Sequence, residues 1–281
     1  WNVNGIRSRI FSNTPSLKKD KIVCEQNSAM SKLISETNAD IICIQETRCS
    51  KVIGDTFELD GYHSIFNESK LTDARGPNRY SGTAVFTKIK PRKIDYQIPN
   101  YNDEEGRIII LDYDDFILIN VYVPNSGSNY EKRKEFNSAL LEFFKQINKP
   151  LIFCGDMNMA IDTYFDKDKV KPMPGIYPHE LEFYNKITTQ TTYGGIFNDS
   201  IDKTKDNIIY TWWNPRCKKI INPQTNLELS AQRIKNHGWR LDYIFTRKIK
   251  SYSSKVLKHI GEYTDPQGSD HAPVFGTFTI N

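Results

Sequence analysis

The chain has 281 residues, of which 38% are hydrophobic and 26% are charged, as expected for a soluble globular protein with a sizeable core. No stretch approaches the ~20 apolar residues of a membrane span, and no secretory signal is visible. The net charge of +4 is compatible with a polyanionic partner, although many enzymes that bind no polyanion have a similar charge.

Regular elements are predicted from hydrophobic periodicity and from turn residues. Helices are predicted at residues 22–37, 130–147 and 180–188. The second is the strongest, because Phe136, Leu140 and Phe144 share one face while charged residues occupy the others. Short apolar runs predict buried strands at residues 41–44, 83–86, 108–111, 116–123, 151–153, 243–245 and 274–280.

Strand hairpins mixed with helices indicate two β-sheets packed face to face with helices outside. We therefore expect the α/β class and a four-layer α/β sandwich, with two packed mixed β-sheets flanked by helices. No repeat, linker or low-complexity segment divides the chain, so we expect one domain over residues 1–281. Because Trp1 stands where a strand would be ending, we also expect that the start is truncated.

The cysteine pattern predicts a reduced, intracellular protein. The five cysteines are odd in number and form no Cys-x-x-Cys pair, and Cys43 and Cys154 fall inside predicted strands. We expect buried thiols rather than disulfides or a zinc site.

Six polar clusters follow apolar runs along the chain. They are residues 1–7, 41–48, 122–125, 154–158, 238–243 and 268–274. Strand ends and their loops can converge at one rim of a sandwich, which is how residues far apart in sequence assemble a site.

Together these clusters resemble the exonuclease III family of abasic-site (AP) endonucleases, within the endonuclease/exonuclease/phosphatase superfamily. The superfamily motifs are Ile-Gln-Glu-Thr-Arg (44–48), Gly-Asp-Met-Asn (155–158) and Ser-Asp-His-Ala-Pro-Val (269–274). The AP endonuclease branch is indicated by Arg-Tyr-Ser-Gly (79–82), Glu-Gly-Arg (105–107), Tyr-Val-Pro-Asn (122–125) and Gly-Trp-Arg-Leu-Asp-Tyr (238–243). The resemblance covers essentially the whole chain and implies the same sandwich, the DNase I-like fold.

Asp156 and Asn158 flank Met157, so in an extended chain both side chains point to the same side. A plain turn is the alternative, because this segment is rich in turn residues. The resemblance implies that Asp156 orients or deprotonates the attacking water, while Asn158 contacts the phosphate or positions Asp156.

His271 has a candidate orienting group in Asp242, although most lone histidines are structural. A carboxylate on one ring nitrogen fixes the tautomer and favours the imidazolium, which leaves the other nitrogen for a phosphoryl oxygen. The resemblance implies that this pair stabilises a pentacovalent transition state. It also implies that Tyr122 contacts the scissile phosphate, where the alternative is a core tyrosine with a satisfied hydroxyl.

Glu46 could end its strand as a solvated cap or bind a hard cation. Mg²⁺ prefers oxygen ligands and keeps several waters, so one or two protein oxygens suffice. The resemblance assigns Glu46 and Asn2 to a Mg²⁺ site, with Mn²⁺ as a possible substitute. The full set that we expect near the metal is Asn2, Glu46, Asp156, Asn158, Asp270 and His271.

An abasic nucleotide can enter a pocket too small for a normal nucleotide. Trp212, Trp239 and Leu241 match the pocket residues of the family, with ordinary core packing as the alternative. The expected substrate-binding set is Asn4, Arg7, Tyr80, Asn125, Trp212, Trp239 and Leu241, with Asn125 on the DNA backbone. The basic residues Arg107, Arg216 and Arg240 are either phosphate contacts or structural groups.

The chain departs from the family pattern at three places. Asn4 stands where some relatives carry Asp, and residues 171–175 replace a more polar stretch. Between Trp213 and Gly238 the chain is longer than in close relatives and carries several basic residues. We hypothesise that this insertion adds contacts to a DNA groove or a wedge into the duplex.

The sequence thus predicts a Mg²⁺-dependent DNA repair nuclease that incises 5′ to abasic sites in double-stranded DNA and also processes blocked 3′ ends. We expect a monomer in a DNA-containing compartment, with no membrane partner. The nearest alternatives are other superfamily phosphoesterases: a nonspecific DNase, a retroelement endonuclease, an RNA deadenylase or a phosphoinositide phosphatase. A noncatalytic DNA-binding or redox-regulatory module is a further alternative, which the complete set of acidic and histidine residues disfavours.

Overall fold

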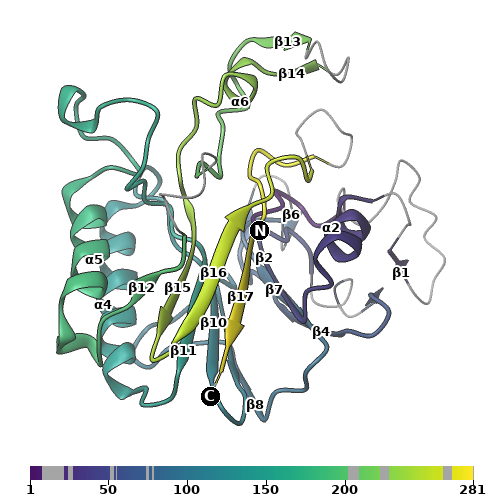
Figure 1. Ribbon diagram of the computed structural model, residues 1–281, viewed down its shortest axis with the longest axis vertical. Helices are drawn as coiled ribbons and strands as arrows, with labels where there is room; N and C mark the ends of the chain where they lie inside the picture. The colour runs from purple at the N-terminus through teal and green to yellow at the C-terminus, as the bar shows by residue number, and fades with distance from the viewer. Residues whose placement is uncertain are drawn as a thin grey trace.

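A mixed β-sheet of six strands is the largest element of the computed structural model (Figure 1). In spatial order its strands are β12 (Asn198–Asp199), β15 (Asp242–Arg247), β11 (Leu151–Asp156), β10 (Ile117–Tyr122), β9 (Ile108–Asp112) and β8 (Lys93–Asp95). β10 and β11 run parallel, and the other neighbours pair antiparallel. The structure describes residues 1–7, 22–24, 28–50, 54, 56–73, 76–77, 79–201, 209–221, 228–261 and 268–280.

The second β-layer consists of a three-stranded antiparallel sheet and a hairpin. The sheet has the order β2 (Ile41–Gln45), β7 (Thr83–Thr87) and β4 (His63–Asn67), and Asn2 adds a parallel bridge to Gln45. The hairpin is formed by β16 (Ser251–Val256) and β17 (Val274–Thr279). The prediction of two packed β-layers is confirmed, although the parallel pairings described in the second layer are isolated bridges, Asn2 with Gln45 and Ile201 with Ser254.

Alternate residues of the central strands face opposite layers, because side chains alternate along a strand. In β10 and β11, Leu118 and Ile152 contribute to the core between the two β-layers. Their neighbours Ile119 and Phe153 belong to the core beneath the outer helices. The apolar runs of the sequence are continuous here because both faces of the large sheet are covered.

Helices α4 (Tyr130–Gln146) and α5 (Pro178–Thr189) cover the outer face of the large sheet, on the left in Figure 1. α4 begins after Asn129, whose side chain accepts a hydrogen bond from the backbone N–H of Lys132. Both helices confirm the sequence prediction to within two residues.

Helix α2 (Ala29–Thr37) covers the outer face of the three-stranded sheet. The predicted helix at 22–37 is therefore wrong in its first part. Ile22–Val23 form the short strand β1, paired in parallel with β3 (Phe57–Glu58). The helix starts after Ser28, because the Ser28 hydroxyl caps the first turn by accepting from the N–H of Ser31.

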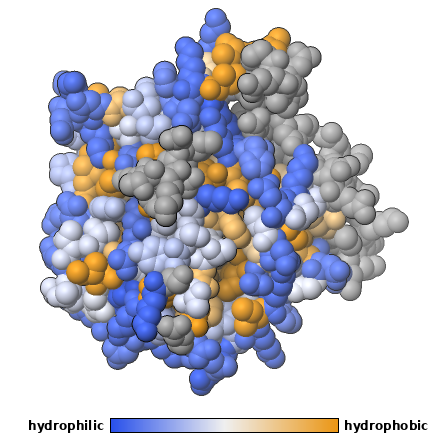
Figure 2. Space-filling model, in the orientation of Figure 1, coloured by the Kyte–Doolittle hydropathy of each residue, from blue (hydrophilic) through white to orange (hydrophobic). Residues whose placement is uncertain are grey.

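The insertion between Trp213 and Gly238 includes a hairpin of β13 (Lys219–Ile221) and β14 (Glu228–Ser230), followed by α6 (Ala231–Ile234). The hairpin and α6 project from the top of the molecule in Figure 1. Apolar surface is visible at the tip of this projection (Figure 2), and Ile221 is 64% exposed. Residues 222–227, which the hypothesis about this insertion also concerns, lie outside the described residues.

The remaining elements are short and none of them was predicted. They are β5 (Thr72–Asp73), β6 (Gly76–Pro77) and the 3₁₀ turns η1 (Lys167–Lys169) and η2 (Thr191–Tyr193). No helix in the described ranges is both long enough and apolar enough to span a bilayer.

Cys43 and Cys154 face each other between the β-layers, and both thiols are free. Hydrogen bonding between the two thiols, followed by burial, raises the pKa of Cys43. A cavity of about 400 Å³ adjoins them between β2 and β17; Asp242 borders it, whereas Asp156 and His271 do not. The predicted buried position holds fully for Cys49 and Cys154, while Cys24, Cys43 and Cys217 are half-buried.

Asn120 links the two β-layers through polar contacts in an otherwise apolar core. Its amide nitrogen donates to the carbonyl oxygens of Ile44 (3.1 Å) and Ala84 (3.0 Å), and its amide oxygen accepts from Gln45 Nε2 at 2.6 Å. All three partners lie in the second β-layer. Because buried polar groups are costly when unpaired, these bonds favour one relative position of the two layers.

Replacing Asn120 with Leu should lower the free energy of unfolding by about 1–3 kcal/mol, because Gln45 and two carbonyl oxygens lose their partner. Urea denaturation of the variant beside wild type measures the change. Asn198→Ala, at an exposed position, is the matched control and should change stability by less than about 0.5 kcal/mol. An Asn120→Leu variant as stable as wild type would contradict the proposed link between the layers.

Candidate active site

The register of three neighbouring strands sets Tyr122, Asp156 and Asp242 side by side. Tyr122 is paired with Asp156 across β10 and β11, and Asp156 is paired with Asp242 across β11 and β15. All three side chains point toward the second β-layer, as alternation from Leu118 and Ile152 requires. Asp156 and Asp242 are only 2% and 4% exposed, so two carboxyl groups are buried next to each other.

His271 completes this row from the segment before β17. Its Nδ1–H donates to Asp242 Oδ2 at 2.8 Å, and its Nε2 lies 3.9 Å from Asp156 Oδ2. Burial alone lowers the pKa of His271, but the carboxylates of Asp242, Asp156 and Asp270 outweigh burial and raise it to about 10. The imidazolium form is therefore favoured, with Nε2 on the side of Asp156.

For Asp156, in contrast to His271, burial has a larger effect on the pKa than the opposing neighbours. Burial raises the pKa of Asp156 to about 7, in spite of the neighbouring His271 and the hydrogen bonds that it accepts. Asn2 Nδ2 donates to Asp156 Oδ2 at 3.0 Å, and the backbone N–H of Asn158 donates to Oδ1 at 2.8 Å. A carboxyl group held in this way can exchange a proton near neutral pH.

The second β-layer contributes Asn2 and Glu46. The Asn2 side chain bridges the layers, because its Nδ2 donates to Glu46 Oε1 (3.3 Å) as well as to Asp156. The Tyr122 hydroxyl also donates to Glu46 Oε1, at 2.5 Å, and Arg48 forms an ion pair with the same carboxylate. Glu46 has a φ of +54°, a left-handed conformation that is rare for this residue type and is often found at functional sites.

Asp270 is held by hydrogen bonds from Asn4 and Trp212. Asn4 Nδ2 donates to Asp270 Oδ1 at 3.2 Å, and Trp212 Nε1 donates to Oδ2 at 3.0 Å. Asn4 is in turn fixed by its backbone N–H, which donates to Asn2 Oδ1 at 3.0 Å. Asp270 is thus connected to the central carboxyl groups through two asparagine side chains.

Asn158 is held by β10 and by the loop after it. It has a φ of +44°, its Nδ2 donates to the carbonyl oxygen of Val123 at 2.8 Å, and its Oδ1 accepts from Asn125 Nδ2 at 3.1 Å. The structure therefore brings Asn125 to the row through Asn158.

The donor set fits a hard divalent cation. Glu46, Asp156 and Asp270 provide carboxylate oxygens, and the buried Oδ1 of Asp242 has no hydrogen-bond partner among the described residues. Among the described residues, Asp156, Asp242 and His271 also offer ligand atoms that lie within 4.8 Å of one another. Oxygen-rich sets of this kind suit Mg²⁺ better than softer metals.

An apolar cluster adjoins the row. It is formed by Ala160, Phe165, Val170, Ile176, Trp212, Trp239 and Leu241. The rings of Trp212 and Trp239 meet edge to face with centroids 5.7 Å apart. The three predicted pocket residues are thus brought together, and Trp212 connects them directly to Asp270.

Two of the basic candidates turn out to be buried rather than available to a ligand. Arg107 donates to Glu105 Oε2 at 2.5 Å, to the carbonyl oxygen of Tyr122 and to the Tyr80 hydroxyl. Arg240 pairs with Asp162 and Asp199. These contacts favour the structural alternative for both arginines, and Tyr80 is linked to the site through Arg107.

Arg7 and Arg216 are not brought to the row. Both are exposed, and the nearest described partner of Arg7 is the Cys49 thiol. The assignment of Arg7 to substrate binding remains a prediction, and for Arg216 both alternatives, a phosphate contact or a structural group, remain open.

Two positioning residues were missed by sequence reasoning. Thr211 Oγ1 accepts from the backbone N–H groups of Leu241 and Asp242, both at 3.0 Å. Ser269 Oγ donates to the carbonyl oxygen of Asn2 (2.8 Å) and accepts from the N–H of His271 (3.1 Å). Ser269 stands inside a recognised motif, but nothing in the sequence marks Thr211.

A family model described as the endonuclease/exonuclease/phosphatase family matches residues 1–271. The chain therefore belongs to the endonuclease/exonuclease/phosphatase family.

Similar proteins refine this assignment. The chain is 30% identical to an exodeoxyribonuclease of Bacillus subtilis, over 98% of this chain and 96% of that protein. It is 29% identical to a DNA-(apurinic or apyrimidinic site) endonuclease of Dictyostelium discoideum, over 100% of this chain and 70% of that protein. It is 31% identical to Recombination repair protein 1 of Drosophila melanogaster, of which it spans 36%. These similarities confirm the resemblance to the exonuclease III family.

Solved structures confirm the fold. An AP endonuclease from Archaeoglobus fulgidus superposes with a TM-score of 0.69 at 21% identity, covering 99% of this chain and 96% of that chain. The AP endonuclease LMAP from Leishmania major gives 0.72 at 22% identity, covering 100% and 86%. The predicted DNase I-like sandwich is therefore correct.

Replacing Arg107 with Met should lower the free energy of unfolding by about 1.5–3 kcal/mol, because Glu105 loses a buried charged hydrogen-bond donor while Lys132 still pairs with it. Guanidinium denaturation measures the loss. The double variant Arg107→Met/Glu105→Gln should be less destabilised than the sum of the two single variants. Strict additivity would mean that the two side chains do not stabilise each other.

Proposed function

We propose that this protein is a DNA repair nuclease that hydrolyses the phosphodiester bond 5′ to an abasic site in double-stranded DNA. The observation that carries the proposal is the juxtaposition of two features. A buried Asp156 faces the Asp242–His271 pair, and the apolar cluster of Trp212, Trp239 and Leu241 begins beside them. The first feature suits hydrolysis of a phosphodiester, and the second suits a sugar without a base.

In the proposed reaction Asp156 accepts a proton from water as the water oxygen attacks the phosphorus. The bond from phosphorus to the 3′ oxygen of the preceding nucleotide breaks, and that oxygen takes a proton from solvent water, leaving a 3′-hydroxyl and a 5′-deoxyribose phosphate. The positions of Asn2 and Asn158 keep the Asp156 carboxyl oriented throughout. A general base placed in this way contributes roughly 10²–10⁴-fold to the rate.

His271 donates from Nε2 to a non-bridging oxygen, where negative charge increases in the transition state. Asp242 keeps the imidazole protonated and fixes its orientation. We assign His271 to the phosphate because Asp242 holds its Nδ1, and its place near the metal stays a prediction. The hydroxyl of Tyr122, held by Glu46, is positioned to contact the same phosphate.

Glu46 and Asn2 would hold Mg²⁺, with Mn²⁺ as a substitute. Asp156, Asn158 and Asp270 would support it, since Asp156 is bonded to Asn2 and to Asn158, and Asp270 is linked to Asn2 through Asn4. When bound, the cation supplies positive charge to the phosphate and to the leaving oxygen. Asn4 would serve the site by fixing Asp270 rather than by adding a carboxylate.

The pocket would exclude a normal nucleotide because Trp212, Trp239 and Leu241 close it with bulky side chains. Asn125, exposed and adjacent to Asn158, is placed for a backbone contact. A second activity, cleaning of blocked 3′ ends, is favoured because the same pocket accepts a terminal sugar. The relative in Bacillus subtilis is named an exodeoxyribonuclease, and a 3′-5′ exonuclease from Neisseria meningitidis shares the fold.

Incision of a labelled duplex with one tetrahydrofuran abasic analogue tests the proposal. Wild type should make one cut 5′ to the analogue with Mg²⁺ and none with EDTA, and an undamaged duplex should receive no internal cut. Asp156→Asn should bind the duplex normally but turn over about 10²–10⁴-fold more slowly. Digestion of both duplexes would instead indicate a nonspecific nuclease, and cleavage of neither would direct attention to RNA and phosphoinositides.

Trp239→Ala should reduce incision at the abasic analogue more than removal of undamaged 3′-terminal nucleotides, because only the first reaction needs a closed pocket. The ratio of the two kcat/KM values is the measurement. Equal losses in both reactions would mean that Trp239 only stabilises the apolar cluster.

A further inference from the structure

Five aromatic rings form a continuous file that leads from the site to the surface. Trp212, whose indole N–H is bonded to Asp270, contacts Trp239 at 5.7 Å between centroids. Trp239 contacts Phe165 at 5.5 Å, and Phe165 contacts Tyr164 at 5.1 Å, both edge to face. The file ends at His237, which stacks on Tyr164 at 4.9 Å with an angle of 4° between the rings.

The two outer rings differ from the rest of the file. Tyr164 is 43% exposed and His237 is also exposed, whereas the inner rings are half-buried. A ring whose purpose is to fill the core does not remain this accessible, as the fully buried Trp213 illustrates. The two outer rings are therefore parallel to each other and accessible at the surface.

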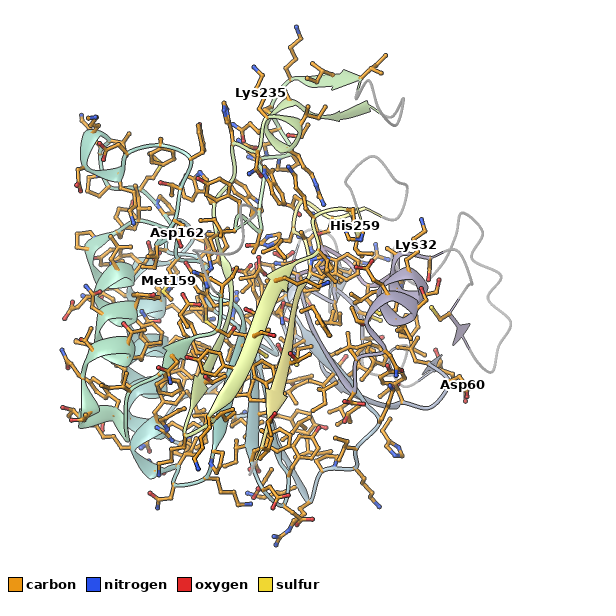
Figure 3. All side chains as sticks on the ribbon, in the orientation of Figure 1. Lys32, Asp60, Met159, Asp162, Lys235 and His259 are labelled. Atoms are coloured by element: carbon orange, nitrogen blue, oxygen red, sulfur yellow. The ribbon has the colours of Figure 1, made fainter. Side chains whose placement is uncertain are left out.

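Backbone pairing makes this surface rigid. Thr163 and Trp239 form an antiparallel bridge, and the N–H of Tyr164 donates to the carbonyl oxygen of Gly238 at 3.1 Å. One residue further along, Arg240 joins the two segments again, because its guanidinium pairs with Asp162 (labelled in Figure 3). The loop after β11 and the segment before β15 are thus fastened together directly beside the stacked pair.

We propose that Tyr164 and His237 form a stacking platform for a DNA base beside the abasic nucleotide. This proposal rests on the function proposed above, which places the scissile phosphate at His271 and the abasic sugar against Trp239. A base next to an abasic position lacks one stacking neighbour within the duplex. An aromatic platform can supply that neighbour, and it tolerates any sequence because every base has a π-face.

The inner rings connect this platform to the candidate active site. A base bound on Tyr164 fixes the position of its own sugar and phosphate relative to Trp239 and the pocket. We therefore assign Tyr164 and His237 to substrate positioning, outside the catalytic row. Their loss should weaken binding of the abasic duplex and leave the chemical step almost unchanged.

The experiment compares Tyr164→Ala, Tyr164→Phe and His237→Ala with wild type. Affinity is measured in EDTA with tetrahydrofuran duplexes that carry the fluorescent base 2-aminopurine on the 5′ or the 3′ side of the analogue. Loss of one stacked base weakens binding by roughly 5- to 150-fold. We expect a weakening in this range for Tyr164→Ala, a smaller one for His237→Ala, and near wild-type affinity for Tyr164→Phe.

The second readout is a direct signature of stacking. Binding of wild type and Tyr164→Phe should quench 2-aminopurine on one side of the analogue, and Tyr164→Ala should abolish this quenching. With Mg²⁺, kcat of Tyr164→Ala should stay within about twofold of wild type while KM rises with the binding constant. Tyr96→Ala is the matched control, because Tyr96 is 37% exposed and follows β8, which forms the edge of the large sheet on the side away from β15 (Figure 1).

Unchanged affinity and quenching in Tyr164→Ala would overturn the platform while leaving the proposed function intact. Equal losses of affinity in Tyr164→Ala and Tyr164→Phe, together with a lower melting temperature, would assign the ring to stability and also overturn it. Failure of wild type to cut the tetrahydrofuran duplex would reject both proposals.

Discussion

The pairing register of β10, β11 and β15 is the constraint on which the site depends. It sets Tyr122, Asp156 and Asp242 in one row. A slip of one residue in either pairing would turn a carboxyl group from the second β-layer toward the outer helices. The backbone hydrogen bonds of the large sheet therefore decide where the acidic groups stand, before any contact between side chains is made.

The row places charged groups in a buried region with little water. The surrounding structure compensates for the free-energy cost of burying these charges. Burial raises the pKa of Asp156, while the carboxylates around His271 raise the pKa of the imidazole in spite of burial. Thr211 and Ser269 hold the backbone of the Asp242–His271 pair through hydroxyl groups. Each buried charge thus has a partner of opposite charge or a directed hydrogen bond, which its desolvation requires.

The second β-layer supplies the side chains that complete the candidate site. Asn2 reaches across to Asp156, and Glu46 meets Tyr122 from the opposite side, so neither layer alone contains the complete donor set. Asn120 fixes the layers relative to each other by bonding to Ile44 and Ala84. The aromatic file from Trp212 to Tyr164 extends this assembly from the carboxyl groups to the surface.

The two β-layers, the helices over residues 130–147 and 180–188, and the motifs that carry the acidic groups could all be predicted from the sequence. Local periodicity and fixed motifs encode these features. The helix prediction failed at Ile22–Val23, which form a strand, because the hydroxyl cap of Ser28 decides where the helix starts. The strands β13 and β14 were not predicted, because they are too short to show periodicity. The burial of Arg107 and Arg240 beside carboxylates, and the support of Asp242 by Thr211, became evident only from the folded structure. Such contacts join residues far apart in the chain, so their geometry depends on how the two β-layers pack.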